Sequence, residues 1–420
     1  MNKKYFTDSL SDEVLANIID DTLNFKKVVK NKNMKIHLFK IIPAVAAIML
    51  VVGLVNIISN INIDNTFGPV SDPVITAAPP VNTPAIPVET TTAPKIEEIP
   101  EPEEIPEYII INGERISTEE TTLELFSNQI TNADIEQLRF MVNLQSLFIY
   151  PEVTRSPDGM NVMSNEPSRI SDISPLAELT NLTGLSLWNT QVSDISPLAG
   201  LTNLTWLFLR DNRISDISPL AELTNLTDLE LVNVSSRRSG NQISDISPLA
   251  NLTNLTFLDL SNNPISDISA LAGLINLTTL GLQENQISDL SILKELTALE
   301  RLWLSGDQIS DISILAEMAN LESLSLGSTQ ISDLSVLAEL TNLTGLALFL
   351  HDSPISDISP LAELTNLIGL SLWNSQVSDI SPLTGLINLA TLRLGNNQQI
   401  SDEQIAEFIE ALPDTEILAD

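Results

Sequence analysis

The chain has 420 residues, and its 55 acidic residues outnumber its 20 basic residues, which gives a formal net charge of −35 at pH 7. So acidic a chain is a poor partner for nucleic acid, and we expect no nucleic-acid binding. There is no cysteine, and the only histidines are His37 and His351. Disulfides and thiolate metal sites are thereby excluded, and acid–base chemistry is disfavoured, so the composition predicts a protein that is not an enzyme and has no cofactor or metal.

An apolar segment near the N-terminus predicts a membrane anchor. Residues Ile41 to Ile58 form 18 positions without a charge, and a helix of that length covers roughly 27 Å, close to a bilayer core. Six lysines lie between residues 26 and 40, and the next basic residue is Lys95. This asymmetry predicts a short cytoplasmic tail (1–40), a transmembrane signal-anchor helix in contact with lipid (41–60) and an extracellular remainder. A buried core helix and a cleaved signal peptide are the alternatives.

Residues 61–107 have the composition of a disordered spacer. Ten prolines lie between Ile63 and Glu107, among many threonines and glutamates, and proline blocks helices and sheet ladders alike. If these 45 residues were fully extended as polyproline II, they would reach on the order of 140 Å. We expect a stalk that holds the following domain away from the membrane.

A period of 22 residues begins at Leu179, where LTNLTGLSLWNTQVSDISPLAG is followed by LTNLTWLFLRDNRISDISPLAE. Copies continue to the one that starts at Leu386, and degenerate copies precede them from about Leu123. The same positions are apolar in each copy, and one copy alone cannot bury them. Residues 108–400 are therefore predicted to form one repeat domain of about 12 turns. The apolar positions of the first full copy are Leu179, Leu182, Leu185, Leu187, Val192, Ile195 and Leu198.

Each copy predicts one strand and one short helical turn. The alternation in Gly-Leu-Ser-Leu-Trp is typical of a strand whose leucines face inward. Ser196 and Pro197 indicate an N-cap followed by proline at the first helical position. Stacked copies then pair their strands in parallel. The predicted fold class is α/β, a leucine-rich-repeat solenoid: a curved horseshoe with a parallel concave β-sheet and short 3₁₀ or α turns on the convex face.

Recurrent polar residues fall at the turns of each copy. Asparagine at the third position and asparagine or threonine at the twelfth are predicted to satisfy backbone groups that no ladder reaches. The third-position residues include Asn181, Asn203 and Asn225, and the twelfth-position residues include Thr190, Asn212, Asn263 and Asn285. Their Asn-Leu-Thr triplets match the glycosylation sequon, but the repeat consensus generates that match by itself. A repeated aspartate suggests calcium, yet one carboxylate per turn supplies too few oxygens; it occurs at Asp194, Asp216 and Asp245.

The end of the chain departs from the repeat. Residues 401–420 include SDEQIAEFIEALPDTEIL, which predicts an amphipathic helix followed by a final short strand. Its apolar face is predicted to contain Ile405, Phe408, Ile409 and Leu412. We expect this segment to be a C-terminal cap that covers the open core of the last turn.

The pattern LTNLxxLxLxxNQISDISPLAxL resembles the internalin-type leucine-rich repeats of Gram-positive bacteria, of the 22-residue class, and the resemblance covers about Tyr108 to Asp420. It implies a right-handed horseshoe that holds a partner on its concave face, with roles in adhesion or host contact. The chain departs from the family in three ways. Among these 420 residues we see no LPxTG sorting signal and expect no immunoglobulin-like domain after the repeats, and the predicted anchor is at the other end.

Residues that flank the strand leucines point away from the core, at the sixth, eighth and tenth positions of each copy. Ten of the 12 aromatic residues after residue 116 occupy these positions, more than strand propensity explains. Five of them, on three successive turns, are predicted to form one exposed patch beside acids on the next two turns, suited to peptides or sugar rings; shielding of the sheet is the alternative. The predicted ligand-binding residues are Phe148, Tyr150, Trp188, Trp206, Phe208, Arg210, Asp228, Glu230, Phe257, Asp259, Arg301, Trp303, Phe349 and Trp373.

Three insertions interrupt the array after the strand. They are Tyr150 to Ser168, Ser235 to Gly240 with Arg237 and Arg238, and His351-Asp352. All leave from the same edge, so they could frame one rim of the binding surface. Simple tolerance of longer loops is the alternative.

Two functions fit these features. The first is a non-enzymatic extracellular binding or adhesion module that recognises a protein or glycan on the concave face and is tethered to the bacterial membrane. The second is a single-pass transmembrane sensor or regulator whose N-terminal tail has a cytoplasmic partner. We expect the repeat domain to be monomeric, and the sequence does not identify the ligand.

Overall fold

The computed structural model describes residues 104–155, 161–163, 168–233, 240–306, 308–327, 330–349, 353, 355–373, 375–395, 397 and 399–418. Within these ranges, no helix is both long enough and apolar enough to cross a bilayer. The predicted tail (1–40), the predicted anchor helix (41–60) and all but the last four residues of the predicted spacer (61–107) lie outside the described residues.

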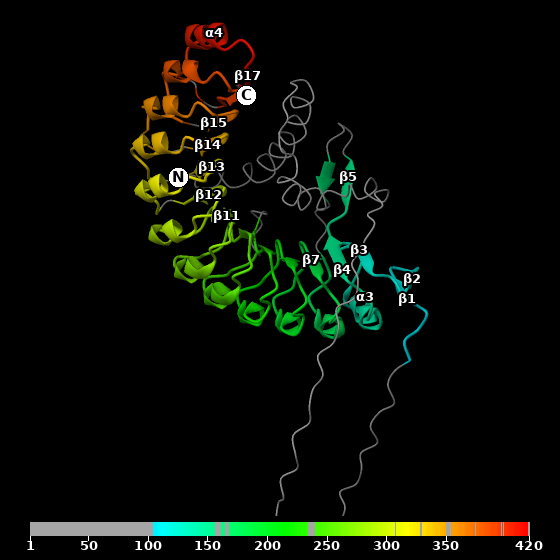
Figure 1. The fold of residues 1–420 in the computed structure, drawn as a ribbon. Helices are drawn as coiled ribbons and strands as arrows, with labels where there is room; N and C mark the ends of the chain where they lie inside the picture. Colours follow the sequence, from blue (N-terminus) through cyan, green and yellow to red (C-terminus); the bar gives the residue numbers. More distant parts are fainter. Residues whose placement is uncertain are drawn as a thin grey trace, which may run out of the picture. The chain divides into compact units, whose positions relative to one another are not determined.

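One parallel sheet of thirteen strands runs through the repeats in chain order, and it curves along the inner side of the arc (Figure 1). From β3 to β16, leucine pairs with leucine in each register, as Leu207 does with Leu229 and Leu324 with Leu346, and in the last register Leu392 pairs with Ile417. The 22-residue period therefore places equivalent residues side by side. The strands are β3 (Thr122–Phe126), β4 (Ser146–Tyr150), β7 (Gly184–Leu187), β8 (Trp206–Phe208), β9 (Asp228–Glu230), β10 (Phe257–Asp259), β11 (Thr279–Gly281), β12 (Arg301–Ser305), β13 (Ser323–Gly327), β14 (Gly345–Phe349), β15 (Gly369–Trp373), β16 (Thr391–Arg393) and β17 (Glu416–Leu418).

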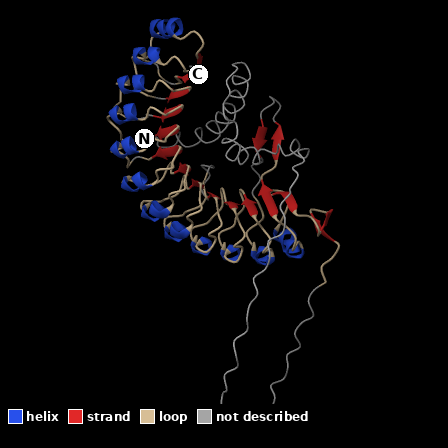
Figure 2. Cartoon of the chain, viewed as in Figure 1, coloured by secondary structure: helices blue, strands red, loops and turns tan. Residues whose placement is uncertain are grey.

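Short 3₁₀ helices alternate with the strands and line the outer side of the arc (Figure 2). A 3₁₀ helix is narrower and shorter than most connecting helices, so the outer layer stays thin. The predicted leucine-rich-repeat solenoid, with its parallel sheet and 3₁₀ turns, is thus confirmed. The helices are η4 (Ser174–Glu178), η5 (Ser196–Leu198), η6 (Ser218–Leu220), η7 (Ser247–Asn251), η8 (Ser269–Gly273), η9 (Ser291–Glu295), η10 (Ser313–Glu317), η11 (Ser335–Glu339), η12 (Ser359–Glu363) and η13 (Ser381–Gly385).

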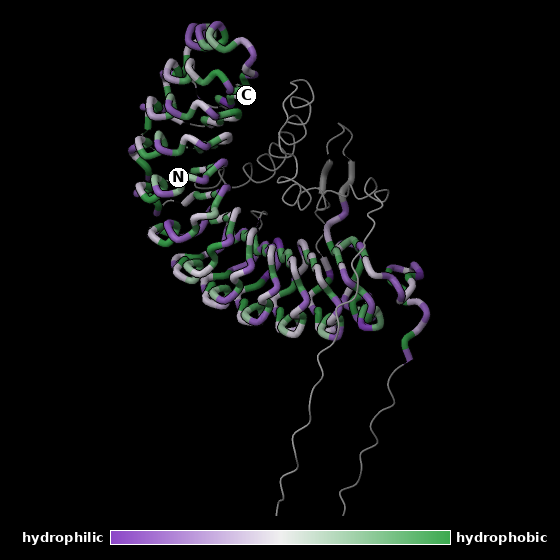
Figure 3. Tube along the Cα trace, viewed as in Figure 1, coloured by the Kyte–Doolittle hydropathy of each residue, from purple (hydrophilic) through white to green (hydrophobic). Residues whose placement is uncertain are grey.

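The core is a continuous column of leucine and isoleucine between the sheet and the 3₁₀ helices. All seven apolar positions of the first full copy are at most 1% exposed, from Leu179 to Leu198. Figure 3 shows the same apolar segments returning in every turn of the array. Because each leucine layer packs on the next, burial in one turn depends on its neighbours.

Asparagine side chains connect the turns, which confirms their predicted structural role. Asn203 Nδ2 donates to the carbonyl of Thr180 at 2.9 Å, and the same bond recurs in nine turns. At the twelfth position, Asn263 Nδ2 donates to the carbonyls of Leu231 and Leu260 at 3.1 and 3.0 Å. Its Oδ1 accepts from the Ile243 N–H at 3.1 Å. Backbone groups between strands are therefore satisfied by side chains.

The repeated aspartate starts each 3₁₀ helix. A carboxylate oxygen of Asp194 accepts a hydrogen bond from the Ser196 N–H at 2.9 Å, and ten turns repeat this contact. The predicted N-cap role of Ser196 is wrong, because the helix begins at Ser196 itself and follows Ile195. The serine supplies the N–H, and the aspartate two residues earlier supplies the accepting oxygen.

Different elements cover the two ends of the column. At the N-terminal end, β1 (Tyr108–Ile111) and β2 (Glu114–Ser117) form a hairpin that precedes α3 (Asn132–Gln137) and η3 (Leu138–Phe140). The hairpin was not predicted. Its turn uses Asn112 and Gly113, both at positive φ, as a tight hairpin turn requires.

At the C-terminal end, α4 (Asp402–Ala411) is capped by Ser401 Oγ, which accepts from the Gln404 N–H. Phe408 and Leu412 of this segment are buried. Ile409 was predicted on the same apolar face but is 49% exposed, because it follows Phe408 by one residue and turns away from the column.

Candidate functional site

The sheet face opposite the leucine column carries the predicted binding residues. Parallel pairing puts sixth-position residues in one row, with Trp206 between Gly184 and Asp228, and Asp228 between Trp206 and Phe257. The eighth-position row contains Phe208, Glu230 and Asp259 in the same way. Neighbouring strands lie about 4.8 Å apart. Side chains from successive turns therefore touch, although they are 22 or more residues apart in the sequence.

Three rings from two turns form a continuous aromatic run, defined here as Phe148 of β4 and Trp206 and Phe208 of β8. The Phe148 and Trp206 rings are stacked with centroids 5.0 Å apart, and the Trp206 and Phe208 centroids are 5.3 Å apart. Trp206 lies over Gly184, where an added Cβ would be 1.9 Å from the indole ring. A side chain at position 184 would displace the indole, so this glycine is what allows the run to form. Its role was missed in the sequence, because nothing there indicates which ring covers it.

The predicted five-residue aromatic patch does not form as one unit. Tyr150 instead packs edge-on against Phe126, with centroids 5.5 Å apart, and its hydroxyl donates to Glu124 at 2.8 Å. Burial is the main cause that raises the pKa of the Tyr150 hydroxyl, followed by the hydrogen bond to Glu124. Tyr150 is thus tied to the first turns of the array and lies apart from the aromatic run.

Trp188 and Phe208 were predicted to be exposed, and this is wrong. Trp188 is only 6% exposed and Phe208 only 9%. Trp188 Nε1 donates to Asp211 Oδ2 at 3.1 Å, and the guanidinium of Arg210 lies over its ring, 4.9 Å from the centroid. Covering by Arg210 and Asp211 of the next turn explains the burial of Trp188. Phe148 and Trp206 keep intermediate exposure.

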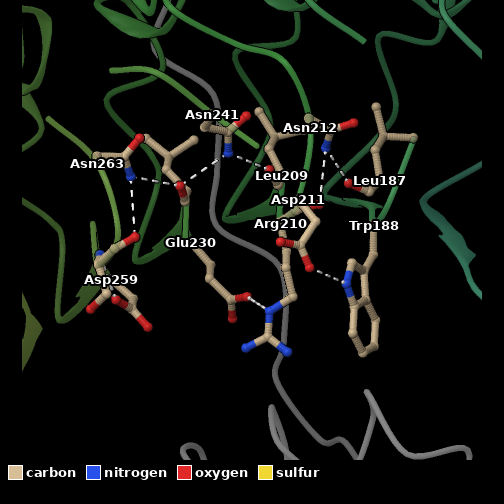
Figure 4. A network of polar contacts seen from close by, with 12 residues as sticks. Leu187, Trp188, Leu209, Arg210, Asp211, Asn212, Glu230, Asn241, Asp259 and Asn263 are labelled. Atoms are coloured by element: carbon tan, nitrogen blue, oxygen red, sulfur yellow. Dashed lines mark hydrogen bonds and ion pairs between the residues drawn. The ribbon is translucent and has the colours of Figure 1, made fainter. Parts of the chain in front are cut away.

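An ion pair on this face joins two neighbouring turns (Figure 4). Arg210 Nε and Glu230 Oε1 are 2.7 Å apart, with side chains 15% and 12% exposed. Burial raises the pKa of Glu230, and the nearby Arg210 charge opposes this increase. The charges of Asp259 and Asp211 raise the pKa of Glu230 further. In Figure 4, Arg210, Glu230 and Trp188 extend from one side of the strands, and the amide side chains of the asparagines lie on the other.

Two further predicted acids lie beside this ion pair. Asp228 Oδ2 accepts from the Thr227 hydroxyl at 2.7 Å, and burial raises the pKa of Asp228. Asp259 Oδ1 accepts from the Ser261 N–H at 3.0 Å, and the side chain is only 9% exposed. It occupies the space left by Gly281, where an added Cβ would be 2.3 Å from Oδ1. Both carboxylates are therefore partly withdrawn from water.

The remaining predicted residues lie further along the sheet. Phe257 and Trp303 meet edge-on at 6.5 Å, and Phe349 and Trp373 do so at 6.4 Å. Arg301 pairs with the adjacent Glu300 at 3.7 Å. The structure therefore places the fourteen predicted residues in several separate clusters along one face, and the largest lies on β4 and β7 to β10.

The insertions are only partly described. The first contains a short antiparallel hairpin, β5 (Val153–Arg155) and β6 (Asn161–Met163), directly after β4. Arg237, Arg238, His351 and Asp352 lie outside the described residues. In the described part of the chain, no three acidic or histidine side chains converge as metal ligands.

Comparison with known proteins identifies the family. A model of leucine-rich repeats in pairs of copies matches residues 202–236, 239–273, 275–317 and 365–408. A solved internalin (InlF) from Listeria monocytogenes is similar at 35% identity and a TM-score of 0.59, covering 73% of this chain and 83% of that one. A leucine-rich-repeat protein from Leptospira interrogans is 25% identical, with a TM-score of 0.52 over 67% of this chain and 74% of its own.

A third structure supports the fold alone. The functional domain of InlJ from Listeria monocytogenes, described as including a cysteine ladder, is 20% identical with a TM-score of 0.50, over 73% of this chain and 64% of that one. This chain has no cysteine. Among curated proteins, none matches the sequence significantly. With an internalin 35% identical over most of its length, this chain belongs to the internalin-type leucine-rich-repeat proteins.

Proposed function

We propose that this protein is a non-enzymatic, extracellular binding and adhesion module that holds a protein or glycan against the concave face of its sheet. The internalin-like repeat fold implies a protein-binding module. The partner contacts the aromatic run and the clusters beside it. Residues 41–60 tether the module to a bacterial membrane.

The observation that carries this proposal is the aromatic run itself. The leucine column on the other side of the sheet already supplies the apolar burial that the repeats need. Phe148 and Trp206 nevertheless stack over one another on the opposite face, with part of each ring in contact with water. Partly exposed rings gathered in this way are typical of surfaces that bind a partner, where aromatic anchors contribute most of the affinity.

The test is a binding screen followed by matched substitutions. The full chain, purified in detergent, is screened against wall glycans and cell-surface proteins. For the strongest binder, the double change Phe148→Ala and Trp206→Ala should weaken binding at least tenfold, because a buried aromatic anchor is worth about 2 kcal/mol or more. Trp373→Ala, which removes a half-buried ring at a distant turn of the same face, is the matched control and should change affinity by less than twofold. Equal losses in both variants would contradict the assignment.

The membrane tether is supported by the sequence pattern of residues 26–58. Protease added to intact protoplasts should remove everything beyond about residue 63 and leave the lysine-rich tail protected. An antibody against the tail would detect the protected fragment. Protection of the repeats against protease would contradict the extracellular placement, even if the concave face binds a partner.

A further inference from the structure

We propose that the acidic patch, defined as Asp228, Glu230 and Asp259, receives a lysine or arginine side chain of the partner, with the rings on either side holding its aliphatic stem. This inference rests on the proposed function, since it assumes that a protein partner docks on the concave face. It specifies which kind of side chain the partner places on the acidic patch.

The geometry places the acidic patch between aromatic rings. In the sixth-position row, Asp228 lies in register between Trp206 and Phe257. In the eighth-position row, Phe208 pairs with Glu230, and Glu230 pairs with Asp259. In the sixth-position row a carboxylate thus lies between two rings, and in the eighth-position row one ring is followed by two carboxylates. A side chain with an apolar stem and a charged end matches such a surface, because stem and end have different neighbours.

The charges at this position are unbalanced. Among the described residues, Arg210 is the one cation that forms an ion pair with the patch, and it pairs with Glu230. The oxygens of Asp228 and Asp259 accept hydrogen bonds from a hydroxyl and a backbone N–H, which carry no charge. Burial raises the pKa of Asp228 and of Glu230, so ionised carboxylates are unfavourable there. A cation from the partner would relieve that cost.

The protein's own Arg210 shows how a cation sits on this surface. Its guanidinium lies over the Trp188 ring, 4.9 Å from the centroid, while its Nε is 2.7 Å from Glu230. Ring face and carboxylate act together on one cationic group. In the neighbouring sixth-position row, Trp206, Asp228 and Phe257 offer the same two kinds of contact. There the described residues supply no guanidinium of their own.

An organic cation fits better than a metal ion. In the described part of the chain, no three acidic or histidine side chains converge as ligands, whereas calcium takes six to eight oxygens. The three carboxylates are spread over two rows and two strands. A side chain several atoms long can reach between them, and its stem gains contact with the rings.

The test uses short peptides as probes and the full chain in detergent micelles. Acetyl-Phe-Arg-Phe-amide and its lysine counterpart are titrated, with tryptophan emission and calorimetry as readouts. The citrulline peptide, which has nearly the shape of the arginine peptide but no charge, is the matched probe. We expect the arginine and lysine peptides to bind at least tenfold more tightly than the citrulline peptide. The double change Asp228→Asn and Asp259→Asn should remove this preference. Glu124→Gln, which removes a concave-face carboxylate near Tyr150, should keep it.

Two results would overturn the inference. One is equal binding of the charged and citrulline peptides, or no saturable binding of any peptide. The other is saturable binding of calcium chloride alone that depends on Asp228 and Asp259. If the citrulline peptide binds as well as the arginine peptide and only Phe148→Ala with Trp206→Ala weakens both, the concave site stands and its charge preference is wrong. The two proposals therefore fail separately.

Discussion

Strands β8 to β10 and strands β13 to β15 belong to the same sheet and share the same core, yet their outward faces are opposite in character. At the sixth and eighth positions, the first region has Trp206, Phe208, Asp228, Glu230, Phe257 and Asp259, and the second has Ser323, Ser325, Gly345, Ala347, Gly369 and Ser371. Because the second region folds with small residues there, the large rings and charges of the first are not required by the scaffold. The comparison therefore distinguishes the residues that the repeat requires for folding from the residues that are available to bind a ligand.

The largest expected effect tests whether the two regions really share one scaffold. Leu229→Ala and Leu370→Ala each remove a fully or almost fully buried leucine from the same repeat position. Each should reduce the free energy of unfolding by about 2–5 kcal/mol, because a cavity is left in a packed column. Urea denaturation followed by circular dichroism measures both. If one variant lost less than half as much unfolding free energy as the other, the leucine cores beneath the two regions would differ.

The second prediction compares the turns beneath the two faces. Asn263→Ala removes hydrogen bonds to buried carbonyls of Leu231 and Leu260 and from the Ile243 N–H. Ser353 occupies the equivalent turn near β14 and donates to the Ile331 carbonyl at 2.7 Å. Unsatisfied buried polar groups cost about 1–3 kcal/mol each. Asn263→Ala should therefore destabilise more than Ser353→Ala in the same denaturation experiment, and the reverse order would contradict the structural role of the asparagines.

A pair of glycines sharpens the comparison at the surface. Gly184→Ala would place a Cβ 1.9 Å from the Trp206 indole, whereas Gly369 has nothing within 4 Å of an added Cβ. Overpacking typically costs about 1–3 kcal/mol, so Gly184→Ala should destabilise by that amount or displace the ring. Gly369→Ala should be neutral or slightly stabilising, because alanine reduces the entropy of the unfolded chain. Near-ultraviolet circular dichroism should change for Gly184→Ala alone. Identical spectra for both variants would mean that Trp206 does not lie over Gly184.

The smallest expected effect is a pH dependence of the folding stability that has opposite signs for Asp216, which precedes η6, and for Asp228 on the concave face. The hydrogen bond from the Ser218 N–H, and then that from its hydroxyl, lowers the pKa of Asp216. Its contribution to stability is present above the unfolded value near 3.8 and is lost as the pH falls through the folded pKa. Burial raises the pKa of Asp228. Its contribution is fully present below the unfolded value and is lost as the pH rises through the folded pKa.

Asparagine substitutions at both positions test these signs. Asp216→Asn should destabilise at pH 7 and have a smaller effect at pH 3, whereas Asp228→Asn should stabilise at pH 7 and not at pH 3. Thermal unfolding at the two pH values measures the difference. If the change in unfolding temperature between pH 3 and pH 7 were the same for the two variants, the different environments assigned to the carboxylates would be contradicted.

Much of the fold could be predicted from the sequence, because the period and the identity of the apolar residues determine which side chains are buried. The start of each 3₁₀ helix was predicted incorrectly, since the Asp194 carboxylate and the Ser196 N–H form a local contact that propensities do not distinguish from an N-cap. The β1–β2 hairpin was missed because it lies outside the repeat.

The candidate surface was predicted less completely than the fold. Position within the repeat correctly assigned the rings and acids to one face of the sheet. It could not indicate that Arg210 covers Trp188, or that Gly184 makes room for Trp206, because both contacts join different turns. The burial of a residue on this face depends on which side chains of neighbouring turns cover it. The repeat pattern does not predict those contacts.

The central claim, that the partner lies on the concave face near the aromatic run, is tested most directly by photo-crosslinking on intact cells. A benzophenone amino acid is placed at Ser146, beside Gly184 in the sixth-position row, and in a second variant at Ser323 in the same row of β13. Both serines have intermediate exposure, so the two probes differ mainly in position. Light should produce a crosslinked species of higher mass from Ser146 and little from Ser323. Equal yields at both positions, or crosslinking from Ser323 alone, would contradict the account.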